Sequence, residues 1–204
     1  TLGPDMARRA ETYLSKATPQ QWVPLWGMAS QPLGDGEGSS SCKPEISSAS
    51  RPLVLMYSGN MGLGHRFGEF LEASVTHGSD LRWCFYGEGK RRPEIEAFIQ
   101  QHPEAPVELG GYVPRAELAD HLASADVHLA SLDPAWDGTM VPSKLQGIFS
   151  MGKPVLFVGS ETSSIGRWIV TSGGGWVIAP GDTTAMSAAL DEALVPSIRQ
   201  EKGA

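Results

Sequence analysis

The feature that most restricts the fold is a regular alternation of short apolar runs and helix-like segments from Arg51 onward. The apolar runs are rich in β-branched and aromatic residues, which is typical of strands buried on both faces. We expect strands at residues 52–58, 81–87, 107–109, 126–132, 154–159 and 175–179. We expect helices between and after them at residues 66–78, 93–102, 115–124, 142–151, 163–173 and 183–194, with Asp182 as the cap of the last helix. This alternation predicts an α/β fold with a doubly wound, Rossmann-like parallel sheet.

The residues before this alternation have a different composition. Residues 4–17 are polar and helix-competent, and residues 20–30 form a short apolar, strand-like run. Residues 27–50 are rich in Gly, Ser and Pro, a composition that cannot offset the entropy of ordering and is typical of a linker. The chain starts at Thr1, as though partway through a helix, which suggests a piece of a longer chain. We therefore divide it into residues 1–26, 27–50 and 51–204.

Composition narrows the functional classes. The net charge of −7 and the pI near 5.2 disfavour a general nucleic-acid binder or a protein that clings to anionic membranes. The cysteines, Cys42 and Cys84, fit a reducing compartment, so we expect a cytoplasmic protein. Cys84 lies in an apolar, strand-like run, so we expect it to pack as an inert core residue. Neither a signal-peptide pattern nor a metal-binding motif occurs, and we expect no metal and no cofactor. Four histidines also lack metal-ligand spacing and are interpreted as structural: His77, His102, His121 and His128.

The segment from Asp137 to Gly159 is interpreted as a loop, a helix, a tight turn and a buried strand. Pro142 suits the first turn of the helix, and Gly152 suits its end. Lys144 in the first turn opposes the helix dipole unless it faces an anion that the same N–H groups bind. Loops of this kind lie at the carboxyl edge of an open α/β sheet, where anionic ligands bind. Lys144 is therefore a candidate phosphate ligand.

Glycine-rich loops follow three of the expected strands. In the first, Gly59–Arg66, the glycines allow backbone N–H groups to approach a diphosphate, and two basic side chains add charge. Its order is GxxGxG rather than the dinucleotide pattern GxGxxG, so a plain turn is the alternative. The second, Tyr86–Glu94, carries Lys90, Arg91 and Arg92, with a solvated basic turn as the alternative. The third, Gly110–Pro114, offers backbone groups to a flat base, or is a plain turn.

Five motifs in order resemble the C-terminal half of GT-B glycosyltransferases of family 4. They are YSGNMGLGH, FYGEGKRRPEIE, LGGYVPRAELADHLASADVHLASL, VPSKLQGIFSMGKPV and GGGWVIAPGD, from about Arg51 to Gly181. The branch that builds colanic acid, lipopolysaccharide and other surface polysaccharides is the most similar. The resemblance implies one half of a GT-B architecture that binds a nucleoside diphosphate sugar. It also implies that residues 1–26 are a remnant of the N-terminal acceptor domain and residues 27–50 an interdomain linker.

The resemblance also implies roles for individual residues. Arg66 and Lys144 are the expected catalytic residues, which stabilise the leaving diphosphate as its charge develops. The expected donor-binding residues are Gly59, Asn60, Gly62, His65, Gly87, Gly89, Lys90, Gly111, Tyr112, Val113, Thr139, Met140, Val141, Pro142, Ser143 and Gly147. The sequence departs from the family at Asn60, where many relatives have arginine. It also departs at Thr139 and Gly147, where relatives commonly have the two acids of a Glu-x7-Glu motif, the second of which binds ribose.

The implied function is retaining transfer of a sugar, of the hexosyltransferase type, to a glycan or lipid-linked acceptor. The acceptor would be held by the missing domain, so we expect this chain to bind donor without turnover. The full-length enzyme could associate peripherally with a membrane, and nucleic acid is not an expected partner. The alternatives are half of a nucleotide-sugar 2-epimerase and a non-catalytic nucleotide-binding or scaffold domain. A nicotinamide-binding domain, with Glu88 on the ribose, is disfavoured because GxGxxG is absent.

Overall fold

The computed structural model describes residues 4–13, 51–140 and 144–203. The strand-like run at 20–30, the proposed linker at 27–50 and the site candidates Val141, Pro142 and Ser143 lie outside the described residues. None of the helices in the described ranges is long and apolar enough to cross a membrane.

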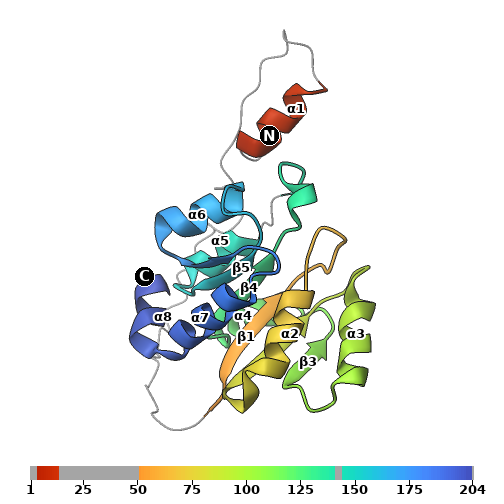
Figure 1. Cartoon of the computed structure of the whole chain (residues 1–204), viewed down its shortest axis with the longest axis vertical. Coiled ribbons are helices and arrows are strands. Elements are labelled where there is room, and N and C mark those ends of the chain that lie inside the picture. The colour runs from red at the N-terminus through yellow and green to blue at the C-terminus, as the bar shows by residue number, and fades with distance from the viewer. Residues whose placement is uncertain (1–3, 14–50, 141–143, 204) are drawn as a thin grey trace.

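All the expected strands form, and every neighbouring pair in the sheet is parallel. The order β3-β2-β1-β4-β5-β6 is that of a Rossmann fold, so the predicted doubly wound sheet is confirmed (Figure 1). The strands are β1 (Leu53–Ser58), β2 (Leu81–Tyr86), β3 (Val107–Gly110), β4 (Val127–Ser131), β5 (Val155–Val158) and β6 (Gly175–Ile178).

Helices cover both faces of the sheet, with the preceding helix α1 (Pro4–Glu11) lying beyond one end of it (Figure 1). Helices α2 (Gly68–Thr76), α3 (Arg92–Gln101) and α7 (Thr183–Leu194) supply side chains to the larger core cluster. Helices α5 (Lys144–Ser150) and α6 (Ser164–Ser172) pack on the opposite face with β5. Helix α4 (Leu118–Ala123) follows a short 3-10 turn, η2 (Arg115–Glu117), and α8 (Pro196–Gly203) ends the described chain.

Alternation along β1 shows how the sheet separates these two layers. Leu55 and Tyr57 are fully buried in the larger cluster, whereas Met56 points to the other face beside Cys84. Burial raises the pKa of the Cys84 thiol to about 11, which suits inert packing rather than redox chemistry. The expected structural role of Cys84 is therefore consistent with its surroundings.

Local sequence signals account for most helix ends. Asp182 caps α7 as expected, accepting a hydrogen bond from the Ala185 amide at 2.9 Å. Gly152, expected to end the helix before β5, has a φ of +62° two residues after α5. The predicted helix at 66–78 was too long at both ends, because α2 spans only Gly68–Thr76. Helix α8 was not predicted.

Candidate active site

The site is set by the point at which the strand order reverses. β1 and β4 are neighbours although two strands separate them in sequence, so their following loops diverge at the carboxyl edge. In open α/β sheets, ligands bind in the crevice that such a reversal creates. Four segments meet this edge: residues 59–67 after β1, 87–91 after β2, 111–114 after β3 and 132–140 after β4.

The loops after β1 and β2 are packed backbone to backbone. The Met61 amide donates to the Glu88 carbonyl at 2.8 Å. Gly87 and Gly89 have φ values of +135° and +149°, and added Cβ atoms would lie 1.9 Å and 2.4 Å from the carbonyl oxygens of Gly59 and Met61. These two glycines are therefore required for the loops to approach each other. The sequence pattern had suggested only an approach to phosphate.

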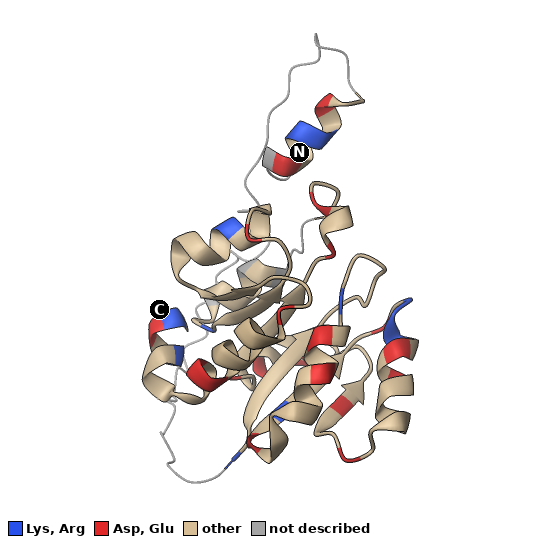
Figure 2. Cartoon of the chain, viewed as in Figure 1, with Lys and Arg blue, Asp and Glu red and all other residues tan. Residues whose placement is uncertain are grey.

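The basic turn before α3 is not simply solvated. Figure 2 shows basic residues at the start of α3 followed by acidic residues in the same helix. The Arg91 guanidinium donates to the His65 carbonyl. The Arg92 guanidinium donates to the carbonyls of Gly87 and Gly110, each at 2.8 Å. The interpretation of a solvated turn is wrong for these two arginines, while Lys90 is exposed.

The end of the first loop is held to β4 by His65 and its neighbour. The His65 ring is only 6% exposed, and its Nδ1 donates to the Ser131 carbonyl at 2.8 Å. The next amide, that of Arg66, donates to the Ser131 hydroxyl at 3.0 Å. Ser131 is fully buried at the end of β4. This pair of bonds therefore fixes the start of α2 across the point of strand reversal.

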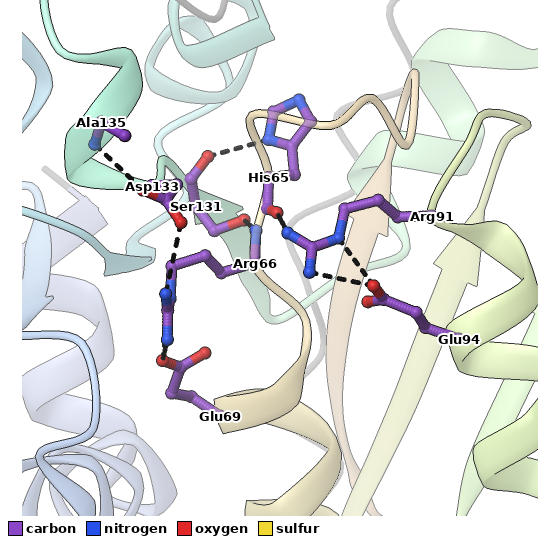
Figure 3. Close-up of polar contacts among 8 residues, drawn as sticks. All are labelled: His65, Arg66, Glu69, Arg91, Glu94, Ser131, Asp133 and Ala135. Carbon is purple, nitrogen blue, oxygen red and sulfur yellow. Dashed lines mark hydrogen bonds and ion pairs between the residues drawn. The ribbon is translucent and has the colours of Figure 1, made fainter.

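The Arg66 side chain lies between two carboxylates (Figure 3). Its Nε donates to Glu69 at 2.9 Å, and its Nη1 lies 3.4 Å from an Asp133 carboxylate oxygen. The hydrogen bond with Glu69 does most to raise the pKa of Arg66 above its ordinary value, with Asp133 adding to it against the effect of burial. A phosphate bound at this point would compete with Asp133 for the Arg66 guanidinium, because the contact with Asp133 is longer than the contact with Glu69.

A groove of about 480 Å³ lies at the end of β3. It is lined by Tyr86, Gly111, Tyr112, Val113, Pro114, Glu117, Asp120 and His121. Tyr112 is 61% exposed, and its hydroxyl lies 3.4 Å from the Glu88 carbonyl. His121 packs edge-on against Tyr86, its buried Nε2 has no hydrogen-bond partner among the described residues, and burial lowers its pKa. The expected base-binding residues Gly111, Tyr112 and Val113 thus share one groove.

The loop after β4 is joined to the first glycine loop. The Asp133 amide donates to the Gly64 carbonyl at 2.8 Å, and Trp136 lies against Gly64, where an added Cβ would be 3.1 Å from its ring. Thr139 is exposed, and its hydroxyl donates to the Trp136 carbonyl at 2.6 Å. Met140 is half-buried and packs against the cluster beneath α5. Two of the expected donor-binding residues therefore lie on this loop.

The next expected residues are only partly described. Helix α5 begins at Lys144, at the carboxyl edge of the sheet, and its side chain lies outside the described atoms. Gly147 is half-buried, and as a glycine it has no side chain to extend toward a ligand. The roles of Lys144 and Gly147 in donor binding stay predictions.

Helix α1 contacts the loop after β4 and the start of α6. The Asp5 carboxylate accepts two bonds of 2.9 Å from Arg167 and one of 2.6 Å from the Ser164 hydroxyl. Arg9 donates to the Asp137 carbonyl at 2.9 Å. A cavity of about 310 Å³ between these elements is lined by Asp5, Arg8, Arg9, Thr12, Asp137, Thr162 and Ser163.

The hydrogen bonds that join these loops and helices to one another were not predicted from the sequence. The cap at Asp133 was detectable, because an acidic residue directly before Pro134 is a helix-start signal, and Asp133 accepts from the Ala135 amide at 2.9 Å. The contacts of Glu69 and Ser131 depend on which strands are neighbours. Within residues 4–13, 51–140 and 144–203, no group of three or more His, Cys, Asp or Glu side chains could hold a metal ion.

A family model described as glycosyl transferases group 1 matches residues 53–195. The probable glycosyltransferase WbjE of Pseudomonas aeruginosa is 29% identical over 140 residues, which are 68% of this chain and 35% of that protein. The chain thus spans about a third of the length of this curated relative.

Solved structures share the fold at low sequence identity. The catalytic domain of cholesterol-alpha-glucosyltransferase from Helicobacter pylori superposes with a TM-score of 0.60 at 17% identity, covering 75% of this chain and 93% of that one. The pneumococcal O-GlcNAc transferase GtfA, solved with UDP and GlcNAc, gives a TM-score of 0.58 at 14% identity, covering 77% and 32%. Because the matching family model covers well over half of the sequence, the chain belongs to the group 1 glycosyl transferases.

Proposed function

We propose that residues 51–204 form the nucleotide-sugar-binding half of a retaining glycosyltransferase. The observation that carries this proposal is the convergence, at one sheet edge, of the glycine loop, the groove after β3 and the loop leading to Lys144. In a chain of this family, that edge is the place for a donor of the nucleoside diphosphate sugar class. The motif order favours the family 4 branch that builds surface polysaccharides.

Each part of the edge has a proposed role. The groove at Gly111, Tyr112 and Val113 takes the base, with Tyr112 offering an exposed aromatic face. The glycine loop faces the diphosphate. Arg66 and Lys144 then stabilise the charge that develops on the leaving diphosphate, Arg66 after exchanging its weaker contact with Asp133 for phosphate.

The rest of the enzyme lies outside residues 51–204. We assign residues 1–26 to the acceptor domain, residues 27–50 to the interdomain linker, and the acceptor to the glycan or lipid-linked class. A cytoplasmic enzyme with peripheral membrane association is consistent with this assignment. The chain by itself should bind donor without sustained transfer, and steady turnover by the isolated chain would contradict this.

A second candidate is a nucleotide-binding domain without transfer activity. Gly147, at the position of the family's ribose-binding acid, is the observation that favours it, because this residue has no side chain to contact ribose. The first candidate is supported instead by Arg66, whose guanidinium lies at the proposed diphosphate site beside Asp133 (Figure 3).

Calorimetric titration with UDP, GDP, ADP and NAD tests the proposal. UDP is the first probe because the pneumococcal neighbour was solved with it. We expect one nucleoside diphosphate to bind and Lys144→Ala to weaken it about tenfold or more, the loss of one charge-assisted contact. Lys202→Ala, which removes a lysine packed over Trp176 in β6, is the matched control and should bind like the wild type. Absence of nucleoside diphosphate binding, or equal binding by Lys144→Ala, would overturn the proposal.

A further inference from the structure

We propose that Arg91 and Arg92 are positioning residues that act on different halves of the nucleotide. Arg91 fixes the glycine loop that faces the diphosphate, and Arg92 fixes the segment after β3 that faces the base. The inference rests on the proposed function, because it takes the two half-sites from there. From the sequence, these two arginines were only part of a basic turn within a family-like motif, and the inference gives each of them a separate role in the site.

The placement of these arginines is unusual for a helix start. Arg91 is the N-cap of α3 and Arg92 its first residue, where positive charge opposes the helix dipole. Such a local conflict is expected where a tertiary or functional contact outweighs the local preference. In this structure the contacts are backbone carbonyls of the loops after β1 and β2 and of the last residue of β3. Glu94 and Glu96 of the same helix hold the guanidinium groups in place.

Arg91 holds the glycine loop at two points. Its backbone amide donates to the Met61 carbonyl at 2.9 Å, and its Nη1 donates to the His65 carbonyl. Residues 62–64 lie between these two anchors. Glu94 accepts from the Arg91 Nε at 3.0 Å, and Figure 3 shows the guanidinium lying between Glu94 and the His65 carbonyl. The Arg91 side chain is only 26% exposed, so most of its surface contacts protein rather than solvent.

Arg92 joins the ends of β2 and β3. One nitrogen, Nη1, is 2.8 Å from both the Gly87 and the Gly110 carbonyl oxygens. The Gly87 amide also donates to the Gly110 carbonyl at 3.1 Å, so this oxygen has both of its lone pairs engaged. Gly110 directly precedes the Gly111–Val113 segment that lines the groove. Removing the guanidinium therefore releases the backbone from which the groove is built.

The two effects are separable because the contacts do not overlap. Among the described residues, the Arg91 guanidinium donates to a carbonyl of the loop after β1, whereas the Arg92 guanidinium donates to carbonyls directly after β2 and at the end of β3. A residue that only stabilises the fold would affect all ligands equally. A positioning residue should instead affect the part of the ligand that its own loop faces.

The test compares Arg91→Ala and Arg92→Ala with Arg51→Ala as a matched control. Arg51 makes a bidentate pair with Asp126 at 2.9 and 2.8 Å, at the amino edge of the sheet, away from the site. The probes are the nucleoside diphosphate that the wild type binds, the corresponding nucleoside, and inorganic pyrophosphate. Calorimetry gives the dissociation constants, and hydrogen exchange without ligand reports on the two loops.

We expect Arg91→Ala to weaken the binding of the nucleoside diphosphate and of pyrophosphate about tenfold, and to leave the binding of the nucleoside unchanged. We expect Arg92→Ala to weaken the binding of the nucleoside diphosphate and of the nucleoside about tenfold, and to leave the binding of pyrophosphate unchanged. Exchange should rise in residues 62–65 for the first variant and in residues 110–113 for the second. Arg51→Ala should change none of these, and Arg92→Lys should recover part of the nucleoside affinity.

Equal weakening of all three probes, in step with a loss of stability, would overturn the inference in favour of a structural role. Wild-type affinity in both variants would overturn it as well, while leaving the proposed function standing. A wild-type chain that binds no nucleoside diphosphate would overturn both proposals. The wild-type titration therefore separates failure of the proposed function from failure of this inference.

Discussion

The carboxyl edge of the sheet is held in two different ways on its two sides. Over β1, β2 and β3, the loops are joined by backbone hydrogen bonds, glycine contacts and arginines on carbonyl oxygens. Over β4, residues 132–140 are held in part by the Arg9 side chain of α1, a helix that precedes the sheet in the sequence. The first side is therefore complete within residues 51–204, whereas the second depends on contacts from outside that range.

This difference has a consequence for the proposed donor site. A loop held by its own domain keeps its shape whichever way a neighbouring domain lies. Individual polar contacts at a surface each contribute little free energy, so they are easily broken. A loop that is held by such contacts with a preceding helix therefore changes its conformation when that helix moves. The half-site for base and diphosphate should thus be preformed, and the segment toward Lys144 should respond to α1.

The largest expected effect comes from breaking the self-contained side. In Gly87→Ala, the new Cβ would lie 1.9 Å from the Gly59 carbonyl oxygen, at a φ of +135° that side chains rarely adopt. We expect a loss of about 3 kcal/mol or more in the free energy of unfolding, measured by urea denaturation. Gly68→Ala is the matched control, since an added Cβ there meets nothing within 4 Å, and it should unfold at or above the wild-type midpoint. An unchanged midpoint for Gly87→Ala would contradict the packing role.

The fold was largely predictable because its signals are local. Apolar runs identified each strand, and Asp182 and Gly152 marked helix ends through chemistry that acts within a few residues. Helix α8, which starts at Pro196, was missed because its sequence is polar and has no apolar face long enough to be recognised. The early part of the predicted helix at 66–78 is instead held by β4, through Ser131.

The site was less predictable because its contacts are tertiary. A glycine that approaches a phosphate and a glycine that approaches another backbone leave the same pattern in a sequence, so Gly87 and Gly89 could not be assigned a packing role. Glu69 is three residues from Arg66 and was within local reach, but Asp133 is 67 residues away. Pairing it with Arg66 requires knowing that β1 and β4 are neighbours.

A smaller effect is expected from weakening the side that depends on α1. Burial raises the pKa of Asp5, but hydrogen bonds from Ser164 and Arg167 and the Arg167 charge outweigh burial and hold it below its ordinary value of 3.8. Ionised Asp5 therefore favours docking of α1, fully above pH 3.8, and this contribution is lost as the pH falls through the lowered pKa. In Asp5→Asn the charge is absent at every pH.

For Asp5→Asn we expect the amides of Trp136 and Thr139 to exchange about fivefold faster at pH 7, measured by hydrogen exchange. Both amides are bonded within the loop that α1 contacts. Arg8→Ala is the control, because Arg8 is 73% exposed and lies 3.5 Å from Asp5, and it should change exchange less than about twofold. Wild-type exchange in Asp5→Asn would show that α1 does not hold the loop.

The smallest expected effect has the opposite sign and comes from Asp137. Burial, followed by the charges of Asp5 and Asp133, raises the pKa of its carboxyl group, and its buried Oδ1 has no hydrogen-bond partner among the described residues. Because the folded-state pKa is raised, the ionised form opposes docking at neutral pH, and this penalty is relieved as the pH falls through the raised pKa. Arg9 contacts the Asp137 backbone carbonyl, so changing the side chain leaves that bond in place.

In Asp137→Asn the repulsion from Asp5 and Asp133 is removed while side-chain size is kept. We expect exchange at Trp136 and Thr139 to slow about twofold at pH 7. After correction for intrinsic exchange rates, wild type and variant should converge in acid, where Asp137 of the wild type is protonated. Faster exchange at pH 7 would contradict the assignment of a penalty to this carboxylate. If the amides of Trp136 and Thr139 exchange faster in Asp5→Asn and slower in Asp137→Asn, the contact with α1 is what holds this loop in place. The reason is that the two variants have little in common except the loss of a charge at that contact.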